Sequence, residues 1–195
     1  MGCHKNRNTV LEVAHQCAPV LAGIKPSNLL IVEKIKVPDI VEVLQGIDVG
    51  KKLLYKTDTK SVWLIYRSTW LKELLDCRDI ADFFRTYGYT KLTELDVVLS
   101  RLGQRYVSYL DSRTDFPHEI GLLLGYPMAD VQGYILNKGR DCLLNGYWKV
   151  YSDAEGAKKI FDIYTKVRQF FVREVKNGKQ FYQTPGTALA ADGSL

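Results

Sequence analysis

Two residues of this chain combine reactive side chains with places where a helix is expected to begin or end. Cys17 lies two residues before Pro19, and the amide N–H groups of a helical turn that restarts there would lower the pKa of its thiol. His118 follows Pro117 at an expected helix start, where a cation is disfavoured, so its imidazole should stay neutral and able to act as a base or metal ligand. We therefore predict Cys17 and His118 as catalytic residues, Cys17 as nucleophile or soft ligand and His118 as base or ligand.

Both residues also have a structural explanation, which the sequence leaves open. Cys17 falls on the apolar stripe of its helix, and a buried free cysteine usually behaves as a small hydrophobic residue. His118 stands in the first turn of a helix, where a capping role is more common than a functional one. Neighbouring His118 and Glu119 diverge by about 100° around a helix and would not bind one ion together, so the sequence identifies no metal and no cofactor.

Five further residues are predicted to bind a ligand, and they are Lys25, Glu119, Tyr126, Tyr147 and Lys149. On an extended segment Lys149 shares a face with Tyr147, and a cation beside an aromatic ring would bind a planar anion. Lys25 is predicted as a second anchor for that anion. The alternatives are a half-exposed strand with a snorkelling lysine and, for Glu119, a favourable interaction with the helix dipole.

The composition is typical of one ordinary globular domain, which we predict over residues 1–183, followed by a disordered tail over 184–195. With 46% hydrophobic and 25% charged residues, the chain is neither a disordered nor a fibrous protein. No apolar run is long enough to span a membrane, and the N-terminus lacks the apolar stretch of a signal peptide. The four cysteines are scattered and form no Cys-x-x-Cys pair, which favours free thiols and a cytoplasmic location.

Hydrophobic periodicity and the positions of proline and glycine predict an α+β fold, with six or seven helices around a small sheet of three to four strands. A capping box over Thr9–Glu12 is expected to start the first helix, and Pro19 is expected to end or kink it near Ala18. The other helices are expected over residues 38–44, 80–87, 95–110, 117–125 and 127–139 and after residue 152. Strands are expected over 29–32, 53–56, 61–67 and 147–151.

Three segments carry a family resemblance: residues 15–25 (HQCAPVLAGIK), 116–127 (FPHEIGLLLGYP) and 146–151 (GYWKVY). In this order and spacing they resemble an uncharacterised family of anaerobic bacteria known only as a domain of unknown function. The resemblance covers about residues 11–181. One departure is Gln16, because family members place a histidine directly before the cysteine. The resemblance implies no activity, and only a redox or metal-related context with flavodoxins or iron-uptake proteins encoded nearby.

The leading hypothesis is a small-molecule or cofactor-binding protein, with the possibility of enzymatic activity left open, whose site is built from the seven residues named above. No Gly-rich phosphate loop, Gly-x-Ser-x-Gly elbow or His-Glu-x-x-His motif occurs, which removes support for several common enzyme classes.

Two alternatives belong to other classes of protein. Residues 119–137 have the pattern of a helix-turn-helix, but the second helix brings few cations, so we do not expect nucleic acid as the main partner. The net charge of +5 and the basic runs at residues 51–60 and 166–179 suggest instead a protein-interaction module with a basic face, which an acidic, flavodoxin-like partner would complement. The alternative without a functional role is that both basic runs are ordinary solvent-exposed surface.

Overall fold

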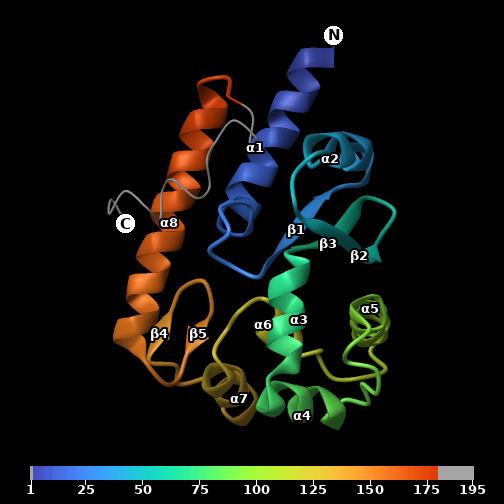
Figure 1. Cartoon of the computed structure of the whole chain (residues 1–195), viewed down its shortest axis with the longest axis vertical. Coiled ribbons are helices and arrows are strands. Elements are labelled where there is room, and N and C mark those ends of the chain that lie inside the picture. Colours follow the sequence, from blue (N-terminus) through green and yellow to red (C-terminus); the bar gives the residue numbers. More distant parts are fainter. Residues whose placement is uncertain (1, 180–195) are drawn as a thin grey trace. The chain divides into compact units, whose positions relative to one another are not determined.

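Residues 2–179 are described by a computed structural model, and they form eight α-helices, one 3-10 helix and five strands (Figure 1). The predicted α+β class with few strands and many helices is therefore confirmed. Backbone packing divides the described residues into two compact units, one of residues 2–68 and 164–179 and one of residues 69–163. The tail predicted over 184–195 lies outside the described residues.

The first unit contains a three-stranded antiparallel sheet with the order β1-β3-β2. Helix α1 packs against β1 and α2 (Figure 1). The elements are α1 (Gly2–Leu21), β1 (Ser27–Glu33), the 3-10 helix η1 (Lys34–Lys36), α2 (Val37–Val43), β2 (Gly50–Lys56), β3 (Lys60–Tyr66) and the later part of α8 (Ala154–Lys176). These bounds confirm the strands expected at 29–32, 53–56 and 61–67 and the helix at 38–44.

Helix α1 departs from the sequence prediction at both ends. It begins at Gly2, so Thr9 lies within the helix, where it is buried and its hydroxyl donates to the Asp39 carboxylate at 3.3 Å. It also continues through Pro19 to Leu21. Proline removes only one backbone donor, and close to the end of a helix few hydrogen bonds are lost when the chain continues past it.

Several groups together satisfy the C-terminal end of α1. Gly23 has a φ of +72°, a left-handed conformation that favours glycine, and the amides of Gly23 and Ile24 donate to the carbonyls of Val20 and Pro19. This is a Schellman motif. The Arg67 guanidinium then donates from Nε to the Val20 carbonyl at 2.8 Å and from Nη2 to the Leu21 carbonyl at 3.0 Å. The family-like segment 15–25 is therefore built as a helix terminus.

The outer edge of β1 is covered by a side chain rather than by another strand. The Gln16 amide donates from Nε2 to the Ile31 carbonyl at 3.0 Å, and the Ile31 amide donates to Gln16 Oε1 at 2.9 Å. This pair imitates a strand partner and blunts an edge at which another chain could add. Gln16 thus has a structural role here.

The second unit is mainly helical and carries a two-stranded ribbon. Its elements are α3 (Ser68–Asp76, of which Ser68 belongs to the first unit), α4 (Arg78–Thr86), α5 (Leu95–Leu110), α6 (Ile120–Leu123), α7 (Met128–Leu136), β4 (Leu144–Asn145), β5 (Lys149–Val150) and the start of α8. The sequence analysis missed α3. It also expected a helix over 117–125, whereas α6 is a single turn of four residues preceded by a turn at Pro117.

Buried Asp130 connects α7 to the segment that follows β5. Its Oδ2 accepts from Trp148 Nε1 at 2.7 Å, and its Oδ1 accepts from the Tyr151 amide and from the amide and hydroxyl of Ser152. All these donors are neutral, and together they satisfy both oxygens of a carboxylate that has no access to water. Asp130 therefore positions segment 146–151 against α7 through buried hydrogen bonds.

We predict that Arg67→Ala lowers the free energy of unfolding by about 2–3 kcal/mol, because two carbonyls at the end of α1 lose a charged donor. Urea denaturation followed by circular dichroism measures this change. The matched control is Arg78→Ala, whose side chain is 92% exposed and which should change stability by less than about 0.5 kcal/mol. Equal stabilities of the two variants would contradict the capping role.

Candidate functional site

Cys17 and Lys25, two of the predicted site residues, lie together in the interior of the first unit. Cys17 is fully buried, and burial raises the pKa of its thiol to about 12, opposite to the lowering expected from nearby amides. Lys25 is 3% exposed, and burial lowers the pKa of its ammonium group to about 8. Its Nζ lies 5.6 Å from the centre of the Tyr164 ring. A protonated, enclosed thiol is a poor nucleophile at neutral pH, so this pair is not the strongest candidate for chemistry.

The second unit holds the most unusual polar group of the described residues. The Glu119 side chain is 0% exposed, and its Oε1 accepts from Arg105 Nε at 2.5 Å and from the Tyr89 hydroxyl at 3.0 Å. Its other oxygen, Oε2, is buried and has no hydrogen-bond partner among residues 2–179. Leaving a buried polar atom unsatisfied costs about 1–3 kcal/mol, so Oε2 is expected to have a partner that the protein itself does not supply.

Arg105 contacts Glu119 through one nitrogen only. Its Nη atoms have no acceptor in the described part of the chain, and 14% of the side chain remains exposed. The guanidinium carbon also lies 4.7 Å from the centre of the Tyr87 ring, so one face of the guanidinium is held by a cation–π contact. Arg105 is thus fixed by a carboxylate and a ring while its two terminal donors are left for an acceptor from outside.

His118 stands beside this pair and is half-buried between two aromatic rings. Its ring centre lies 5.3 Å from that of Phe116 and 5.5 Å from that of Tyr134. Burial lowers the pKa of the imidazole, and the Glu119 carboxylate opposes that shift. The expectation of a neutral imidazole therefore agrees with the direction of the shift, although the cause is burial rather than the helix dipole.

Tyr126, Tyr147 and Lys149 are brought together on one side of the second unit. The Tyr126 ring stacks on Trp148 at 5.1 Å, and its hydroxyl donates to the Tyr147 carbonyl at 3.2 Å. Lys149 Nζ donates to the Gly139 carbonyl at 2.5 Å. Each of these contacts joins two segments of the protein, so these residues contribute to the fold, and their role in ligand binding stays a prediction.

The predicted catalytic pair of Cys17 and His118 is divided between the two units. A single site that uses both residues therefore stays a prediction. Within the second unit, His118 and Glu119 are joined by three residues that the sequence analysis did not select, namely Tyr87, Tyr89 and Arg105. One signal for this site is present in the sequence, because a carboxylate within an apolar segment such as 119–124 needs a buried cation, but nothing in the pattern singles out Arg105 among the nearby cations.

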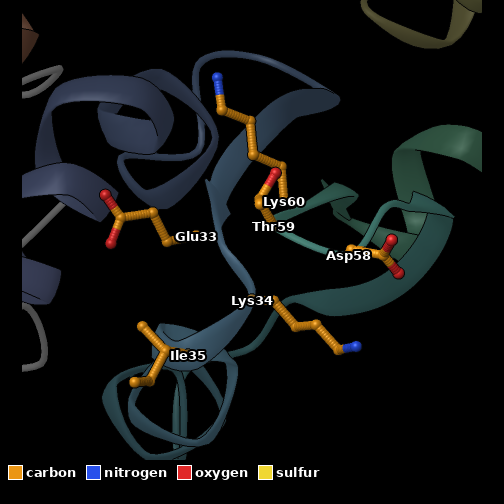
Figure 2. A pocket seen from close by; sticks show the side chains of 6 residues that line it. All are labelled: Glu33, Lys34, Ile35, Asp58, Thr59 and Lys60. Atoms are coloured by element: carbon orange, nitrogen blue, oxygen red, sulfur yellow. The ribbon is translucent and has the colours of Figure 1, made fainter.

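A surface hollow of about 590 Å³ lies in the first unit, lined by Glu33, Lys34, Ile35, Asp58, Thr59 and Lys60. Figure 2 shows that these side chains point away from one another rather than toward a common centre. The charged groups therefore do not converge on a ligand, and we do not place the functional site there.

In the helix-turn-helix alternative, the side chains of α7 that could read base edges are Gln132 and Asn137, and one of them is engaged within the protein. The Asn137 amide donates back to the Gly133 carbonyl at 2.8 Å, and Asp130 is occupied in the core, whereas Gln132 is exposed. Among the described residues no group of three or more His, Cys, Asp or Glu side chains is arranged to hold a metal ion.

Comparison with protein-family models identifies the chain. Residues 13–184 match the model described as a protein of unknown function, DUF3793, and the chain belongs to that family. Comparisons with curated proteins and with solved structures gave no significant match. Within residues 2–179 no helix is both long and apolar enough to cross a membrane.

Burial of Lys25 makes the stability of the folded protein depend on pH. Its pKa is about 8 in the folded protein against an ordinary 10.5, so between pH 8 and 9 the unfolded chain keeps a proton that the folded chain loses. Stability from Lys25 therefore rises with pH in that window, by about 1 kcal/mol, while the raised pKa of Cys17 acts in the opposite direction from about pH 8 upward, where the unfolded thiol begins to ionise, and offsets part of the rise. We predict that Lys25→Met removes this rise. Parallel stability curves for the two proteins from pH 7 to 9 would contradict it.

Proposed function

We propose that this protein binds a small phosphorylated molecule, with the phosphate held by Arg105 and Glu119 in the second unit. The single observation that carries the proposal is the incomplete ion pair between them. Glu119 Oε2 has no donor and the Arg105 Nη atoms have no acceptor among the described residues. An outside group that provides both a donor and an acceptor would complete the pair.

The singly protonated form of a phosphate monoester, which predominates below its second pKa of about 6, has this combination of groups. Its unprotonated oxygens accept from a guanidinium, in the two-point geometry for which arginine is suited. Its remaining hydroxyl donates to a carboxylate oxygen. Sulfate has the same size and shape but carries no proton at neutral pH, so it would leave Oε2 unsatisfied and bring a second anion close to Glu119. A site of this kind therefore selects phosphate by its proton.

The residues around Arg105 and Glu119 favour a defined binding site for an anion over non-specific attraction of anions to a charged surface. The Tyr89 hydroxyl and the Tyr87 ring hold Glu119 and Arg105 from two further sides, so little ordering is needed when a ligand arrives. Half-buried His118, whose pKa is lowered, adds a neutral imidazole at the edge of the site. The imidazole is positioned to accept or donate a proton if the bound molecule also reacts, and this keeps an enzymatic role within the proposal.

The sequence also led to expectations about the location, the biological setting and the partners of the protein, and these form part of the proposal. A cytoplasmic location is supported by Cys17, Cys77 and Cys142, which are unpaired thiols of the kind that a reducing compartment maintains. A bacterial, anaerobic setting with a redox or metal-related pathway and an acidic, flavodoxin-like partner remains a proposal that rests on the family resemblance and the basic charge. DNA binding is not favoured by any contact described above.

Isothermal titration with inorganic phosphate and with sulfate tests the proposed function. We expect phosphate to bind and sulfate to bind at least 10-fold more weakly, because only phosphate donates to Oε2. Lowering the pH from 8 to 6.5 should strengthen phosphate binding as the protonated species increases. Arg105→Lys keeps the charge but loses the planar fork, and we expect at least a 10-fold loss of affinity for phosphate.

Arg78→Ala is the matched control, since Arg78 is a fully solvated arginine of the same unit, and it should bind phosphate normally. Arg105→Lys also guards against unfolding, because full removal of the cation would leave a buried carboxylate unpaired. The proposal is wrong if the wild-type protein binds no phosphate, or if it binds sulfate equally well.

A further inference from the structure

A row of aromatic rings runs beside the Arg105 site. The ring centres of Tyr109 and Phe116 are 5.2 Å apart, those of Phe116 and His118 are 5.3 Å apart, and those of His118 and Tyr134 are 5.5 Å apart. We call Tyr109, Phe116, His118 and Tyr134 the aromatic row. Its members come from the end of α5, the turn before α6 and the middle of α7, so the fold gathers them from three segments.

Both ends of the aromatic row face solvent. Tyr109 is 40% exposed and Tyr134 is 39% exposed, and Phe116 and His118 between them are half-buried. A fold gains most from rings that it covers completely, and contiguous exposed rings are typical of surfaces that bind something. The row therefore offers ring surface that the core of this unit does not use.

Two positions in the chain place the aromatic row next to the proposed phosphate site. Tyr109 lies four residues after Arg105 on α5, and residues at this spacing occupy the same face of a helix. His118 directly precedes Glu119, the residue that holds Arg105. A ligand with its phosphate on Arg105 thus has aromatic surface next to it from both α5 and the turn before α6.

We infer that the ligand is a nucleotide, whose base stacks on an exposed end ring of the aromatic row, Tyr109 or Tyr134, while Arg105 and Glu119 hold its phosphate. The rings of the row are inclined to their neighbours by 54–90°, so a base stacks on one ring rather than along the row. This inference rests on the proposed function and adds the class of ligand to it. Aromatic side chains stack on every base, because each base has a flat π surface, and a neutral imidazole does the same. The row provides few polar atoms that read the edge of a base, so the site is expected to accept several bases with similar affinity.

The test compares three probes by isothermal titration with the 195-residue chain at pH 6, where about half of the phosphate monoester carries a proton: inorganic phosphate, adenosine 5′-monophosphate and adenosine. We expect adenosine 5′-monophosphate to bind about 5- to 100-fold more tightly than phosphate, which is the gain that stacking of one base provides. The double variant Tyr109→Ala/Tyr134→Ala should lose this gain and bind both anions equally, with its affinity for phosphate unchanged. Val97→Ala, an exposed apolar residue of α5, is the matched control and should keep the gain.

The outcomes separate the two proposals. If phosphate binds and the nucleotide binds no more tightly, the inference is overturned and the proposed function stands. If the double variant keeps the full gain, the base does not lie on the aromatic row and the inference is equally overturned. If neither phosphate nor the nucleotide binds, both the inference and the proposed function fail.

Discussion

A carboxylate removed from water must be compensated by the donors and charges that the fold brings to it, and in residues 69–163 this constraint falls on Glu119. The side chain is completely buried, and its charge is balanced by Arg105 and by the hydroxyl of Tyr89. Because breaking such a pair would leave a buried charge alone, α5, the turn after α4 and the turn before α6 are bound to one arrangement. The proposed phosphate site is the part of this arrangement that the protein leaves incomplete.

The other family-like segments are explained by the same requirement that buried polar groups find partners. Residues 15–25 end a helix with a Schellman motif at Gly23 and with Arg67 on the last carbonyls. Residues 146–151 place Trp148 on the carboxylate of Asp130. These segments therefore need particular residue types for structural reasons. The segment containing His118 and Glu119 combines such a role with an unsatisfied carboxylate oxygen, and the other unsatisfied buried atom of the described residues is the neutral hydroxyl of Tyr151.

Local pattern was sufficient to predict the class of fold and most elements, including the strands of the first unit and the long helix α5. It failed where a distant residue decides the local structure. Helix α1 was expected to end or kink near Ala18, and it continues to Leu21 because its terminus beyond Pro19 is stabilised by Arg67, which no local pattern near the helix reveals. Glu119 was selected for its place at a helix start, whereas its actual partner Arg105 occupies a position on α5 that looks like any other solvated arginine. Burial raises the pKa of Cys17 and lowers that of Lys25, and it too depends on how distant residues pack.

The most direct test of the central claim is the nuclear magnetic resonance signal of the Arg105 Nε–H group in ¹⁵N-labelled protein during titration with phosphate. A protected signal is expected in the free protein, because this group donates to buried Glu119. With phosphate the signal should shift progressively and saturate, while sulfate at the same concentration should leave it almost unchanged. A signal that stays in place at saturating phosphate, or that moves equally with both anions, would contradict the claim that phosphate completes this ion pair.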